Sequence, residues 1–179
     1  MPESKEKITN EEIAKYLWEL LKKCSKEFYL SFKSDAEKNG FSFDSAQEIR
    51  LTREIVMIDM WIISKALSPD AKILDELHKI YLFGHSNMAT TEEAKKEFPK
   101  AAEKELYERY KKYYESWNDK NSEQWVLALN MLEYMLNTQD NKILNIALQY
   151  SVITHIYAFM KIILSSMLNF KKEFEITDN

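Results

Sequence analysis

The scarcity of glycine and proline is the feature that most restricts how this chain folds. Two glycines and three prolines occur among 179 residues, too few for the tight turns that a sheet protein needs. The long segments are instead rich in Leu, Ile, Lys, Glu, Ala and Met, which favour helix. With 45% hydrophobic residues, the chain can bury a core without a disulfide or metal. The sequence therefore predicts one all-α domain over residues 1–179.

Hydrophobic periodicity and helix-ending residues predict an antiparallel bundle of about six helices. Ser68 is expected to cap the third helix with Pro69 in its first turn, and Pro99 either kinks the fourth helix or starts a new one. A flexible loop is expected at 86–91, a polar break at 118–121, and frayed ends at 1–9 and 171–179. The predicted helices span residues 10–39, 45–67, 68–85, 91–117, 122–137 and 140–170.

The helices at about 45–67 and 140–170 are the most apolar. A helix that is hydrophobic around most of its circumference belongs in the centre of a bundle, so the other helices are expected to surround these two. The most apolar stretch, residues 152–168, is shorter than the ~20 residues of a membrane span. It also contains His155 and Lys161. We therefore expect a buried helix of a soluble protein.

Charge and cysteine content indicate the cellular setting. The 25 basic and 29 acidic side chains give a net charge of −4, which disfavours nucleic acid as a main partner. The single cysteine, Cys24, cannot form an internal disulfide and fits a reducing compartment. The first twelve residues lack the apolar core of a signal peptide. The expected location is the cytoplasm.

Asp59 is the most unusual residue of the predicted central helices. It lies on the apolar half of the 45–67 helix, between Ile55 and Ile63. The other charged residues of this helix gather on the opposite side and are expected at the surface: Arg50, Arg53, Glu54 and Lys65. A buried carboxylate costs several kcal/mol unless it is paired, hydrogen-bonded or protonated. Asp59 therefore needs a partner.

His155 and Lys161 of the last helix are the candidate partners of Asp59. If these groups line a pocket, they form the polar centre of a ligand site, since titratable groups in unusual surroundings often mark sites. If they only contact one another, they fix the register of two central helices. The second interpretation is the commoner outcome for a single acid on an apolar face.

No metal, cofactor or catalytic motif is found in the sequence. The nearest match to a di-iron motif, Asp75 to His78, has Asp where Glu is expected and occurs once. His78 is expected on an exposed helix face. Two glycines also leave almost no possibility of a phosphate-binding loop. Neither a metal site nor an enzyme is the favoured reading.

Two helix faces are candidate contact surfaces. Residues 101–117 carry an aromatic stripe that packs against the core or, alternatively, binds a partner protein; its interface candidates are Tyr107, Tyr110, Tyr114 and Trp117. The last helix carries a strip of small residues that admits another helix from the same chain or a second copy. This strip comprises Ala147, Ser151, Thr154, Ala158 and Ser165.

The favoured function is a non-enzymatic protein-interaction or assembly module, including association into a homodimer. The alternative is a small-molecule-binding bundle with a pocket lined by Met and aromatic residues. In that alternative, Asp59 and His155 are the polar contacts, with Lys161 as a further candidate. A large exposed apolar surface would favour the first function, and an enclosed pocket reached by Asp59 and His155 would favour the second.

Overall fold

A computed structural model describes residues 5–87, 90–118, 124–137 and 145–178, and these segments form six helices and two short strands. The elements are β1 (Glu6–Thr9), α1 (Asn10–Lys38), α2 (Ser45–Ala66), α3 (Ala71–Asn87), α4 (Glu92–Asn118), α5 (Gln124–Leu136), α6 (Ile146–Glu173) and β2 (Phe174–Thr177). The predicted all-α class is confirmed. Parts of the predicted loop at 86–91, of the polar break at 118–121 and of the starts of the last two helices lie outside the described residues.

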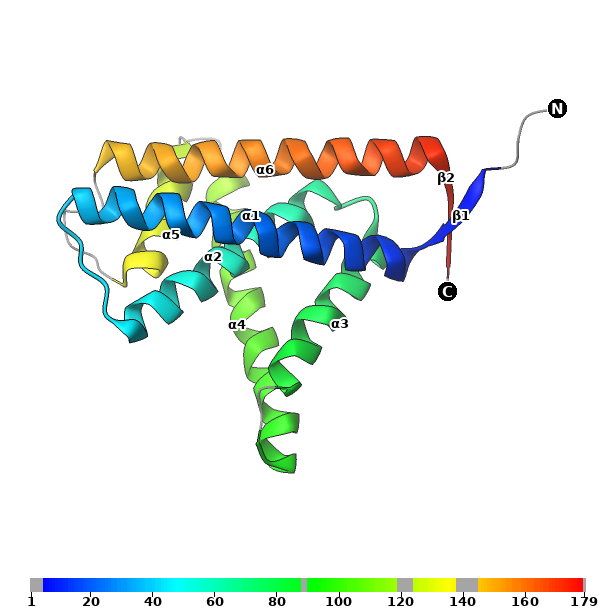
Figure 1. The fold of residues 1–179 in the computed structure, drawn as a ribbon, viewed down its shortest axis with the longest axis horizontal. Helices are drawn as coiled ribbons and strands as arrows, with labels where there is room; N and C mark the ends of the chain where they lie inside the picture. Colours follow the sequence, from blue (N-terminus) through cyan, green and yellow to red (C-terminus); the bar gives the residue numbers. More distant parts are fainter. Residues whose placement is uncertain (1–4, 88–89, 119–123, 138–144, 179) are drawn as a thin grey trace.

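The helices form a bundle with a projecting hairpin. α1 and α6 run antiparallel along one another, and α3 with α4 extends away from them as a pair (Figure 1). α2 contacts α1, α4, α5 and α6, so it is the helix that the others enclose. Residues 57 to 64 of α2 are all buried, which matches the prediction of a central second helix.

α6 is less enclosed than its composition led us to expect. It packs on α1, α2 and α5 by one face, while several large apolar residues on its other face remain exposed. α6 is also the one helix among the described residues that is long and apolar enough to cross a membrane. Core helices of soluble proteins pass the same test. The expectation of a buried last helix is confirmed for the face that packs on α1, α2 and α5 and is wrong for the outer face, which no other described element covers.

Local sequence explains where the helices begin and end. Thr9 and Asp44 each form a capping box at the start of α1 and α2, and the Asn145 side chain accepts hydrogen bonds from the first amides of α6. Gly40, with φ of +87°, follows the end of α1, as the Asn39–Gly40 pair predicted. Pro69 does not open α3, which begins at Ala71 after a turn.

Residues 6–9 and 174–177, near the two ends of the chain, pair with each other instead of fraying. β1 and β2 form a parallel two-stranded sheet in which Ile8 is opposite Ile176, and both side chains pack against the core. Figure 1 shows β1 and β2 together at one end of the molecule. The prediction of frayed ends is wrong for residues 6–9 and 174–177, because backbone pairing across the whole chain leaves no local sequence signal. Residues 1–4 and 179 lie outside the description.

Candidate functional site between α1 and α6

Asp59 is the centre of a buried polar cluster that joins three helices. Its side chain is fully buried. Ser25 of α1 donates a hydrogen bond of 2.5 Å from Oγ to one carboxylate oxygen. Nε2 of His155, on α6, lies 2.5 Å from the other oxygen. Each carboxylate oxygen of Asp59 therefore has a partner, which compensates for its removal from water.

His155 connects this cluster to the surface. Its ring stacks on Phe28 with centroids 3.8 Å apart and planes 2° apart, and Phe159 stacks more loosely at 5.8 Å. An ionised carboxylate only accepts hydrogen bonds, so Nε2 is the donor in the contact with Asp59. Nδ1 makes no hydrogen bond with the described residues and is not sealed from solvent. It is the polar atom that the cluster offers to a ligand.

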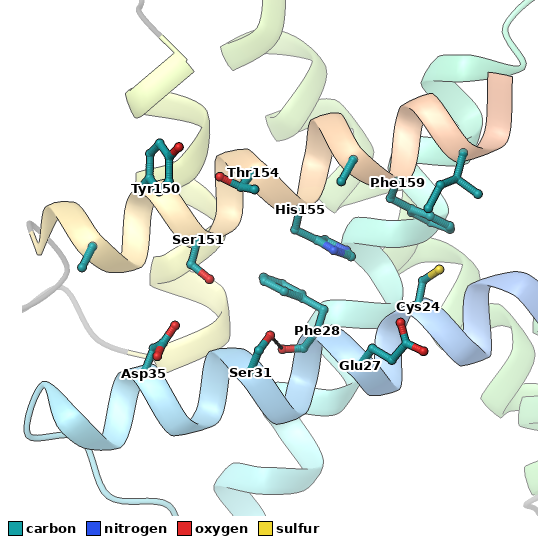
Figure 2. A pocket seen from close by; sticks show the side chains of 13 residues that line it. Cys24, Glu27, Phe28, Ser31, Asp35, Tyr150, Ser151, Thr154, His155 and Phe159 are labelled. Carbon is teal, nitrogen blue, oxygen red and sulfur yellow. Dashed lines mark hydrogen bonds between the residues drawn. The ribbon is translucent and has the colours of Figure 1, made fainter. Parts of the chain in front are cut away.

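A groove of about 470 Å³ lies over His155, between α1 and α6. Ser151 and His155 point from α6 toward α1, and Phe28 rises from α1 beneath the imidazole (Figure 2). Most of the predicted small-residue strip lines the groove: Ala147, Ser151, Thr154 and Ala158. The small side chains thus leave open space along α6 beside its contacts with α1.

The chemistry of the groove does not favour covalent catalysis. Cys24 lines it, and burial followed by the charge of Asp59 raises the pKa of its thiol. Such a thiol stays protonated at neutral pH and is a weak nucleophile. Glu27 and Asp35 lie at the groove, and no Lys or Arg among the described residues lines it. The groove can therefore offer Nδ1 of His155 for a hydrogen bond and attract a cationic group through Glu27 and Asp35.

Only one of the two predicted partners of Asp59 contacts it. His155 contacts it, as the spacing allowed, but Lys161 is exposed and makes no contact with it. Lys161 lies on the outer side of α6, away from the core. Asp59 itself is fully buried and does not line the groove; it acts on the groove through its contact with His155 and through its charge on Cys24. Ser25 was missed because a serine on an apolar stripe gives no signal of its partner.

Three of the four residues of the predicted aromatic interface on α4 make contacts within the chain, and Tyr110 among them is buried. Tyr110 is 5% exposed and its hydroxyl lies 3.1 Å from Nε2 of His78, so His78 is not a free surface residue as predicted. Tyr114 contacts the Ser64 hydroxyl at 3.0 Å, and Trp117 packs edge-on against Trp61. Tyr107 alone of the four is well exposed. The stripe follows the core-packing alternative.

Glu54 is a second buried charge that the sequence pattern placed at the surface. It is 4% exposed and accepts two hydrogen bonds from Arg109 of α4, at 2.9 and 2.8 Å. The prediction was wrong because α4 covers this side of α2, and helix periodicity cannot show which sides of a central helix are covered. A bidentate Arg–carboxylate pair compensates for the burial.

The outer face of α6, formed by Ile146, Tyr150, Tyr157, Leu164 and Leu168, is the largest exposed group of apolar side chains on one helix. Their exposed fractions are 71%, 64%, 42%, 45% and 69%. Between residues 146 and 170, His155 and Lys161 are the only residues that can carry a charge. Contiguous apolar surface of this kind marks contact sites more often than scattered single residues do.

Neither metal-binding geometry nor similarity to known proteins adds to this picture. Among the described residues, no three His, Cys, Asp or Glu side chains lie together in a group that could hold a metal ion. No protein-family model, curated protein or solved structure matches the chain.

Proposed function

We propose that the protein is a non-enzymatic assembly module that binds a second copy of itself through the outer face of α6. The observation that carries this proposal is the exposure of five large apolar side chains along one helix that bears a single lysine on that side. From Ile146 to Leu168 the face extends over about 33 Å of helix. Burying such a surface is the main favourable term in association.

The spacing of these residues favours an antiparallel pair. Successive members of the outer face are separated by four, seven, seven and four residues, a pattern that reads the same in both directions about Tyr157. In an antiparallel dimer with its twofold axis at Tyr157, Ile146 lies opposite Leu168 of the second copy. Isologous contacts of this kind are the commonest in homo-oligomers.

Lys161 is compatible with this arrangement. Four residues from the axis, it lies about 12 Å along the helix from the Lys161 of the second copy in an antiparallel pair. That separation exceeds the Debye length of about 8 Å at physiological ionic strength. In a parallel pair the two ammonium groups would lie side by side, and like charges in contact oppose association.

Charge substitutions test the interface and its direction together. I146E and L168K, made separately, are each expected to convert a dimer into a monomer in sedimentation equilibrium. The double variant is expected to restore the dimer, because each Glu then faces a Lys of the other copy. F83E, which alters an exposed apolar residue of α3, is the matched control and stays dimeric.

Three outcomes would overturn the proposal. One is a wild-type protein that remains monomeric at tens of micromolar. Another is a dimer that neither single charge affects. The third is a monomer that sediments with phosphatidylcholine vesicles and loses this binding on L168K, which would make a lipid surface the occupant of the outer face.

A further inference from the structure

A second cavity, of about 700 Å³, lies between α1, α2 and α3. It shares no residue with the groove between α1 and α6 or with the outer face of α6. Its walls are mostly apolar and aromatic: Trp18, Tyr29, Ile49, Val56 and Tyr81. This size is within the ~300–1,000 Å³ range of sites that bind small molecules.

Tyr81 presents an unused hydrogen-bonding group to this cavity. The residue is 4% exposed, and its ring packs edge-on against Trp18 and His85, with centroids 6.4 and 4.8 Å away. Its hydroxyl has no hydrogen-bond partner among the described residues, yet it is not sealed from solvent. Because Tyr81 lines the cavity, the hydroxyl is open to it. Burial raises the pKa of Tyr81, so the hydroxyl remains a donor at neutral pH.

Arg53 and His85 supply further donors at the same cavity. Arg53 pairs with Glu105 of α4 through one terminal nitrogen, and its guanidinium carries five N–H groups in all. His85 makes no hydrogen bond to a described residue. Burial, and then the charge of Arg53, lowers its pKa, so the imidazole is neutral and offers one N–H.

The acidic residue of the lining is already neutralised. Glu48 accepts a hydrogen bond of 2.5 Å from the ammonium group of Lys33 and one of 3.2 Å from the hydroxyl of Tyr29. The charge of Glu48 is therefore compensated by side chains of α1, whereas Arg53 has N–H groups beyond the one that pairs with Glu105. The cavity thus combines apolar walls with hydrogen-bond donors of Tyr81, Arg53 and His85 that a ligand can use.

We propose that this cavity binds an aliphatic carboxylic acid. The hydrocarbon chain lies against Trp18 and Val56, and the carboxylate accepts hydrogen bonds from Tyr81 and Arg53, with His85 beside them. Charge-assisted hydrogen bonds to a carboxylate are the stronger class, so the acid is preferred over an alcohol or an amine of the same length.

Gly84 allows the cavity to be filled without disturbing the fold. It lines the cavity, and a Cβ added to it would meet no atom within 4 Å. Leucine favours helix by roughly 0.8 kcal/mol over glycine. G84L is therefore expected to keep or raise the melting temperature while its side chain occupies the open space.

Calorimetric titration with decanoate, decanol and decylamine tests the proposal. Decanoate is expected to bind about tenfold or more tightly than decanol, with no measurable binding of decylamine. Y81F removes a hydroxyl that has no partner among the described residues, so its melting temperature stays unchanged while decanoate affinity falls about tenfold. R53Q is expected to abolish the preference for decanoate over decanol. G84L is expected to abolish binding of decanoate and of decanol.

The control variant is A158L, which fills the groove between α1 and α6 and is expected to leave decanoate affinity unchanged. The proposal is overturned if wild type fails to bind decanoate, if decanoate and decylamine bind equally, or if Y81F and G84L bind as wild type does. Loss of binding on A158L or L168K instead would move the site to the groove or to the outer face of α6.

Discussion

A carboxylate in the core is tolerated only where hydrogen-bond donors satisfy both of its oxygens. Asp59 meets this condition through Ser25 and His155, one on each oxygen. Helix periodicity could predict that Asp59 is buried and that His155 is within reach, because both follow from position on an apolar face. It could not choose between His155 and Lys161, since the rotation of α6 about its axis depends on packing against α1, α2 and α5.

Substitution of Asp59 should measure what this cluster contributes to stability. D59N replaces one carboxylate oxygen of Asp59 with an NH2 group, which then faces a donor of Ser25 or His155. We expect the free energy of unfolding to fall by about 1–3 kcal/mol. D59L leaves Ser25 and His155 both without an acceptor and is expected to cost about 3–5 kcal/mol. Urea denaturation is the measurement, and E93Q, at an exposed position of α4, is the control.

A combined replacement distinguishes unpaired groups from poor packing. If the loss in D59L comes from unpartnered donors, the triple variant D59L/S25A/H155F should recover much of it, because apolar groups of similar volume can replace a buried polar cluster. A triple variant as unstable as D59L would show that shape, not hydrogen bonding, decides the cost.

His78 should make the protein acid-sensitive. Burial lowers its pKa, although Asp75 and Glu103 act in the opposite direction. As the pH falls, the unfolded chain therefore takes up a proton at His78 before the folded protein does. The free energy of unfolding is unaffected by this group above a pH of about 6.5 and decreases as the pH falls below it. His85, whose pKa is also lowered, adds to this trend. H78Q should reduce the slope by at most about 1.4 kcal/mol per pH unit.

Denaturation midpoints between neutral and mildly acidic pH provide the measurement for His78. Gln keeps a group that can hydrogen-bond to Tyr110, so the neutral-pH stability of H78Q should stay near that of wild type. If wild type and H78Q lose stability in parallel on acidification, the buried imidazole is not the source of the acid sensitivity.

At the scale of helices, local signals predicted most boundaries and failed where distant contacts decide. The ends of α1 and α2 follow from Asn39–Gly40 and from the capping residues, which act over one turn. Pro69 was misplaced because Ser68–Pro69 fits both a helix start and a turn. The exposure of the outer face of α6 could not be foreseen, because composition shows that a helix is apolar but not which neighbours cover it.

Pro99 is accommodated in α4 by a contact from α3. Proline lacks an amide hydrogen, so the carbonyl of Lys95 loses its usual helical donor. The hydroxyl of Ser86, on α3, donates to that carbonyl at 3.3 Å. The continuous α4 therefore depends at this point on the paired helix, and neither alternative drawn from the sequence included this contact.

Replacing Pro99 should stabilise the start of α4 selectively. P99A restores the helical hydrogen bond to Lys95, so amide hydrogen exchange in residues 95–98 should slow by about tenfold or more, given a propensity gain of up to ~3 kcal/mol. Amides of α2 serve as the internal control and should not change. Equal exchange in both proteins would mean that this segment opens without breaking the helix at residue 99.

At the scale of the whole molecule, the two ends of the chain are held together at one end of the bundle (Figure 1). Besides the β1–β2 pairing, Asp178 accepts hydrogen bonds from Asn10 at 3.1 Å and from Lys72 at 2.5 Å. Lys171 lies 2.8 Å from Asp70. The C-terminal segment thus contacts both the start of α1 and the start of α3, which packs on α1.

Removing this closure should lower stability without affecting self-association. Deletion of residues 174–179 exposes the core side of Ile8 and removes Ile176, and we expect a loss of about 1–3 kcal/mol in the free energy of unfolding. D178N removes the exposed ion pair with Lys72 and keeps an oxygen that can accept from Asn10, so it should cost less than about 1 kcal/mol. The outer face of α6 remains intact in both variants, so sedimentation equilibrium should still report a dimer. A truncated protein that is stable but monomeric would show that the terminal strands, and not α6, carry the interface.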